Sequence, residues 1–165
     1  MSILQKKVSA ASVVLLLSVL FAPKGFCHCQ IPCGIYDDEL RFRLIGEHIA
    51  TIEKSVTMIT QLMDESPLNM NQIVRWVQNK ENHADELSHI VTYYFMTQRL
   101  NPVDEKDPKA YTEYTKKLTL LHQMLFYAMK AKQTTDLSNV DKLKAILDDF
   151  RAAYFGPQAE KQTRP

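Results

Sequence analysis

Four stretches of this chain repeat apolar residues every three or four positions, and this periodicity limits the fold more than any other feature. Such spacing places one apolar stripe along an α-helix, whereas a half-buried strand alternates apolar and polar residues at every second position. The chain is therefore expected to be all-α. The stripes occupy residues 40–63, 70–95, 111–129 and 140–154.

Proline and glycine separate the four stripes. Breaks fall at Ser66-Pro67, Asn101-Pro102 and Gly156-Pro157, and Asp107-Pro108 places a proline in the first turn of the third helix. Helices joined by short links pack against their neighbours in opposite directions. The sequence thus predicts an antiparallel four-helix bundle over residues 37–157, with a first helix of roughly 25 residues and a solvated tail at 158–165.

Composition excludes several other classes of protein. A length of 165 residues suits one domain. Only 4 glycines argue against a many-turned β fold and against a glycine-rich phosphate-binding loop. Lys and Arg number 20 against 19 Asp and Glu, so the chain lacks the basic excess of nucleic-acid-binding proteins.

Residues 1–27 have the features of a secretory signal peptide. Lys6 and Lys7 precede an uncharged, mostly apolar run at 8–22, and small residues stand at positions −3 and −1 of a cut between Cys27 and His28. The apolar run is shorter than the roughly 20 residues of a membrane-spanning helix. We expect a leader-processing protease to remove this segment, leaving an exported chain, periplasmic or extracellular, without a stable membrane anchor.

The segment 28–36, His-Cys-Gln-Ile-Pro-Cys-Gly-Ile-Tyr, has no helical stripe and carries most of the metal-binding chemistry. Cleavage before His28 frees an α-amine, which a metal can bind together with the Cys29 amide nitrogen and the thiolates of Cys29 and Cys33. Adjacent amine, amide and thiolate donors close five-membered chelate rings and favour a planar site. Planar nitrogen donors suit Ni(II) or Cu(II), whereas tetrahedral sulfur sites suit zinc.

These residues resemble the N-terminal hook of the nickel-containing superoxide dismutases, His-Cys-x-x-Pro-Cys-Gly-x-Tyr. All the fixed positions match, namely His28, Cys29, Pro32, Cys33, Gly34 and Tyr36. The resemblance implies one nickel ion per subunit, bound by the amine and imidazole of His28, the amide and thiolate of Cys29, and the thiolate of Cys33. It also implies that Tyr36 is the catalytic residue that limits access to the metal, and that four-helix bundles assemble as a homohexamer.

The implied reaction converts superoxide into oxygen and hydrogen peroxide through a Ni(II)/Ni(III) cycle. Hydrated Ni(II) is too difficult to oxidise for this purpose. Two thiolates and an ionised amide are strong electron donors and stabilise Ni(III), and the metal keeps the thiols deprotonated. The donor set therefore suits the redox cycle that the resemblance implies.

The chain departs from the family pattern at one position. Some members carry a glutamate eight residues after the hook tyrosine, where it orients the N-terminal imidazole. Leu44 stands at that position here, with Glu47 three residues further on. Because metal-bound histidines usually need such a partner, His83 in the polar stretch of the second helix is a candidate for this role.

Other interpretations of the same residues remain open at this stage. Export would allow Cys29 and Cys33 to form a disulfide in a purely structural bundle, and a non-enzymatic protein could use the same hook to bind copper or nickel. Glu86-x-x-His89 has the spacing of a di-iron bundle, but such sites need the motif twice. His48 lies on the apolar stripe and is interpreted as a core histidine.

Overall fold

The computed structural model describes residues 37–156, and these residues form helices and short connections without strands. The prediction of an all-α fold is confirmed. The elements in chain order are α2 (Asp38–Met63), α3 (Met70–His89), the π-helix η1 (Ile90–Arg99), α4 (Pro108–Gln133) and α5 (Ser138–Phe155). Of the predicted parts, the leader, the hook at 28–36 and the tail at 158–165 lie outside the described residues.

Polar side chains begin three of the helices. The carboxylate of Asp37 accepts a hydrogen bond from the Glu39 amide at 2.9 Å, and that of Asp107 accepts one from the Ala110 amide at 3.1 Å. Asn69 caps α3 in the same way. These bonds satisfy amide groups that have no partner within the first turn. At the other end of the chain, Gly156 takes a φ of 74° and ends α5.

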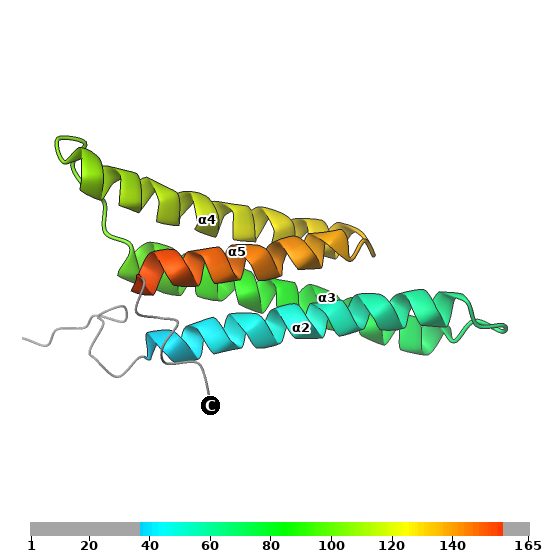
Figure 1. Cartoon of the computed structure of the whole chain (residues 1–165). Helices are drawn as coiled ribbons and strands as arrows, with labels where there is room; N and C mark the ends of the chain where they lie inside the picture. The colour runs from blue at the N-terminus through cyan, green and yellow to red at the C-terminus, as the bar shows by residue number, and fades with distance from the viewer. Residues whose placement is uncertain (1–36, 157–165) are drawn as a thin grey trace, which may run out of the picture. The chain divides into compact units, whose positions relative to one another are not determined.

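The four helical rods pack in a closed order, with α2 beside α3, α3 beside α4, α4 beside α5, and α5 beside α2. Figure 1 shows the rods running alongside one another, with short turns joining successive ones. This is the predicted antiparallel four-helix bundle. Within residues 37–156, no helix is apolar enough over a sufficient length to cross a membrane.

Aromatic rings fill the core at the end of the bundle where α2 begins. Phe42, Phe95 and Phe150 are almost completely buried, and their ring centroids lie 5.0 to 5.3 Å apart. Tyr154 packs against all three. Because α2, η1 and α5 each contribute rings to this cluster, the start of α2 is held in place by close packing against η1 and α5.

The second helix differs from the prediction in its last ten residues. The sequence pattern predicts one continuous helix there, whereas the structure continues α3 as a π-helix at Ile90–Arg99. In a π-helix each amide bonds to the carbonyl five residues earlier, and the turn is wider. Side chains support the widened turn, because the Thr97 hydroxyl and the Gln98 amide each donate to the carbonyl five residues before at 2.8 Å.

The hairpin of α2 and α3 extends beyond the turn between α4 and α5 (Figure 1). The first half of α3 therefore exposes apolar side chains along one face. Met70, Val74 and Val77, spaced four and three residues apart, are 58%, 57% and 39% exposed. We call these three residues the α3 apolar stripe.

Candidate functional site

The predicted metal ligands His28, Cys29 and Cys33, and the predicted access residue Tyr36, lie outside the described residues. The described chain begins at Asp37, directly after the hook segment. The part of the site that the structure describes is therefore the end of the bundle where α2 starts.

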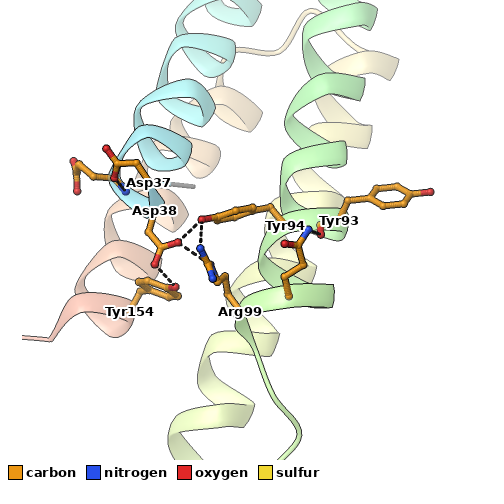
Figure 2. Close-up of polar contacts among 8 residues, drawn as sticks. Asp37, Asp38, Tyr93, Tyr94, Arg99 and Tyr154 are labelled. Carbon is orange, nitrogen blue, oxygen red and sulfur yellow. Dashed lines mark hydrogen bonds and ion pairs between the residues drawn. The ribbon is translucent and has the colours of Figure 1, made fainter. Parts of the chain in front are cut away.

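A polar cluster occupies this end of the bundle. Asp38, in the first turn of α2, accepts hydrogen bonds from Arg99 Nε at 2.8 Å and from the Tyr154 hydroxyl at 2.9 Å. The Tyr94 hydroxyl donates a hydrogen bond to the same oxygen as Arg99, and Arg99 Nη2 donates to the Tyr94 hydroxyl at 2.7 Å. We call Asp38, Tyr94, Arg99 and Tyr154 the Asp38 cluster; Figure 2 shows the four side chains converging.

The electrostatics of the cluster keep its groups in fixed protonation states. Burial by itself raises the pKa of Asp38, but the hydroxyls of Tyr94 and Tyr154 and the charge of Arg99 outweigh it and hold this pKa below its usual value. Burial and the bond to Asp38 raise the pKa of both Tyr94 and Tyr154. The carboxylate therefore stays ionised and the two phenols stay protonated around neutral pH.

Two arginine side chains also lie over the Tyr94 ring. The guanidinium carbons of Arg99 and Arg41 lie 4.8 and 5.1 Å from the ring centroid, within the range of cation–π attraction. The neighbouring Tyr93 points away from the cluster (Figure 2) and stacks on His89, with ring centroids 4.5 Å apart. Of this pair of adjacent tyrosines, only Tyr94 takes part in the site.

Sequence reasoning missed this cluster for a geometric reason. In the sequence, Asp38 is one of several acids at the start of a helix, Tyr94 and Tyr154 belong to the apolar stripes, and Arg99 follows the second stripe. In an α-helix, residues five apart point about 140° away from each other. The π-helical turn instead aligns Tyr94 with Arg99, and the apolar spacing of the second stripe is that of an ordinary α-helix.

His83, the candidate partner for the His28 imidazole, already contacts another histidine. His83 Nδ1 lies 2.8 Å from His48 Nδ1, across the interface of α2 and α3. His48 is half-buried and is not part of the apolar core cluster, so it lies at the edge of the core and not within it. The proposed contact between His83 and His28 stays a prediction, because residue 28 lies outside the described residues. Leu44 packs against the core, and Glu47 is exposed.

Residues 37–156 contain no group of three or more histidine, cysteine, aspartate or glutamate side chains arranged to hold a metal ion. Glu86 and His89 are both exposed on α3, so the structure gives no support to a di-iron centre in the bundle.

Comparison with known protein families places this chain beside one of them. The family model of nickel-containing superoxide dismutase matches residues 23–158, which is most of the chain. Neither the curated proteins nor the solved structures include a match. The matched range covers both the hook segment and the helical bundle.

Proposed function

This chain belongs to the nickel-containing superoxide dismutases, and from that premise we propose that His28, Cys29 and Cys33 bind its nickel ion beside Tyr36. The enzyme disproportionates superoxide, so that two superoxide anions and two protons give one oxygen molecule and one hydrogen peroxide molecule. Nickel is its cofactor. The observation that carries the ligand assignment is the complete match of the hook at residues 28–36, which lies inside the matched range.

The donor set of the hook fits nickel in a redox role. A free amine and an ionised amide supply nitrogen donors in adjacent positions, and Cys29 and Cys33 supply two thiolates. When bound, nickel supplies the one-electron chemistry that superoxide disproportionation needs. The protein residues have other tasks: Cys29 and Cys33 must stay reduced, and Tyr36 limits which molecules reach them. Thiolates are readily oxidised, so restricted access protects the site.

Processing of the leader completes the proposed ligand set. A protease cuts between Cys27 and His28, and the exported chain then begins with a free α-amine. The family match supports this division, because it begins at residue 23 and leaves out the charged and apolar part of the leader at 1–22. We place the mature enzyme in the periplasm or outside the cell.

A homohexamer is the proposed assembly. Its support in the bundle is the α3 apolar stripe, Met70, Val74 and Val77, which lies where α3 extends past α4 and α5. Apolar side chains in a row on an exposed helix face are typical of a surface that another protein covers. A second copy of the chain is the occupant that this assembly provides.

The non-enzymatic alternative, a secreted bundle that only holds nickel or copper, gains no support from the family match. The same is true of a structural bundle closed by a Cys29–Cys33 disulfide. Both alternatives predict a protein without superoxide-disproportionating activity, so one measurement separates them from the enzyme.

The proposal is tested by the intact mass and metal content of the native protein. We expect a chain that starts at His28 with one nickel ion and two free thiols. A variant with one alanine inserted before His28 should lose activity, because its His28 nitrogen is then an amide instead of an amine. Adding one alanine at the C-terminus is the matched control and should leave activity unchanged. Full activity in a chain that starts elsewhere or carries the insertion would contradict the ligand set.

A further inference from the structure

We propose that Asp38, Tyr94, Arg99 and Tyr154 are positioning residues for the reaction, and that this cluster anchors the base of the nickel hook to the bundle. The inference rests on the proposed function, because it takes the hook at 28–36 as the metal site. It adds a role for four residues that the hook motif does not contain.

The backbone limits how far Tyr36 can lie from Asp38. Two peptide units connect residue 36 to residue 38, so their Cα atoms are at most about 7 Å apart in any conformation. Whatever holds Asp38 therefore limits where Tyr36 and the preceding ligand loop can lie. Asp38 is also the first residue of α2, so the cluster acts at the junction between hook and bundle.

Side chains from two other elements hold Asp38 firmly in place. Asp38 comes from α2, Tyr94 and Arg99 from η1, and Tyr154 from the last turns of α5, so one carboxylate links three elements. Both of its oxygens are engaged, one by Arg99 and Tyr94 and the other by Tyr154. Hydrogen bonds from a charged donor to a carboxylate are among the stronger ones in proteins. The packed rings of Phe42, Phe95 and Phe150 lie against Tyr154 and prevent it from moving aside.

The Asp38 cluster is poorly suited to supplying protons for peroxide formation. The lowered pKa of Asp38 and the raised pKa of Tyr94 and Tyr154 keep these groups in one protonation state around neutral pH. Groups that do not change protonation near working pH are poor acid–base catalysts. The geometry instead suits a rigid support.

The π-helical form of η1 is what brings two of these side chains to Asp38. Tyr94 and Arg99 are five residues apart, and only the wider turn aligns both with Asp38. A regular α-helix would direct Arg99 away from Tyr94 by about 140°. The wider turn therefore lets Tyr94 and Arg99 both donate hydrogen bonds to the carboxylate of Asp38, the first residue of α2. π-Helical turns are often found at functional sites for this kind of reason.

The test uses full-length processed enzyme with Asp38→Asn and a matched control, Glu53→Gln. Glu53 forms an ion pair with Lys144 at 2.6 Å and so also links α2 to α5, but it lies about 22 Å further along α2. Both substitutions remove one carboxylate from a contact between the same two helices. Only Asp38→Asn should affect the hook.

We expect Asp38→Asn to keep one nickel per chain while kcat per nickel falls by about tenfold or more, since small displacements of reacting groups have effects of that size. The electron paramagnetic resonance spectrum of the oxidised enzyme should change with it, because the hook ligands shift. Glu53→Gln should retain the wild-type spectrum and kcat per nickel within about twofold. Should Asp38→Asn fold poorly, Tyr154→Phe keeps the Arg99 ion pair and should show the same changes to a smaller degree.

The proposal is overturned if the Asp38 and Tyr154 variants lose thermal stability but keep the wild-type spectrum and kcat per nickel. Failure of the proposed function would look different. In that case the wild-type protein itself would lack nickel, or would bind it without a free amine at His28, and the variants would not be needed to reveal it.

Discussion

At the scale of single residues, the pair His48 and His83 shows what a histidine on an apolar stripe can do. Their Nδ1 atoms lie 2.8 Å apart and their ring centroids 5.1 Å apart, a hydrogen-bond distance at which one Nδ1 donates and the other accepts. Protonation of the accepting nitrogen would turn its ring into an imidazolium and leave two N–H groups facing each other, so the hydrogen bond between the rings would be lost. Burial first, and then the His83 charge, lower the pKa of His48, while Glu86 and Glu47 act in the opposite direction.

This pair predicts a loss of stability in mild acid. Because the pKa of His48 is lower in the folded than in the unfolded chain, the unfolded chain binds the proton more readily, and the unfolding free energy falls as pH drops below about 6.5. In His48→Asn, whose amide does not titrate, the melting temperature should vary less between about pH 7.5 and pH 5. His122→Asn, at an exposed position on α4, is the control and should keep the wild-type slope. Equal slopes in the two variants would argue against this role for the pair.

At the scale of the elements, the boundaries follow from local chemistry. The start of α4 needs only an acid followed by proline, since Asp107 caps the helix and Pro108 lacks the amide that would go unused there. These signals are adjacent in the sequence and need no tertiary partner. The π-turn at 90–99 is different, because its contacts run to Asp38 on another element.

The cap predicts a measurable share of stability. Asp107→Ala should lower the unfolding free energy by about 1 kcal/mol, because the Ala110 amide loses its acceptor and the helix start loses a favourable charge. Glu105→Ala removes the same charge from the same loop and should change the unfolding free energy by less than about 0.5 kcal/mol. Chemical denaturation of the two variants and wild type supplies the comparison. Similar losses in both would show that net charge, and not the cap, is responsible.

At the scale of the whole molecule, the described part of the bundle leaves the side chains of the α3 apolar stripe exposed. The α3 apolar stripe lies on the part of the hairpin that extends beyond α4 and α5, where no other described helix reaches it. This arrangement supports the proposed homohexamer. Burying apolar surface against another copy is favourable by roughly 25 cal/mol per Å².

The stripe predicts the effect of added charge on assembly. The double variant Val74→Glu and Val77→Glu should shift the enzyme from the proposed hexamer to smaller species, as measured by sedimentation velocity at one protein concentration. Gln72→Glu with Asn82→Asp adds the same charge at exposed positions of α3 that are not three or four residues from the stripe, and should leave the assembly unchanged. A hexamer that persists in the valine variant would place the subunit contacts elsewhere on the bundle.

The sequence by itself determined the all-α bundle and the start and end of most helices, and it contains the hook motif on which the proposed ligands rest. These depend on short-range signals: apolar spacing, capping acids, prolines, and donors adjacent along the chain. Only the tertiary structure brought Asp38 together with Tyr94, Arg99 and Tyr154, from positions 56, 61 and 116 residues away. The same holds for His48 and His83, because packing of one helix on another decides which polar groups meet, and helical periodicity alone does not contain that information.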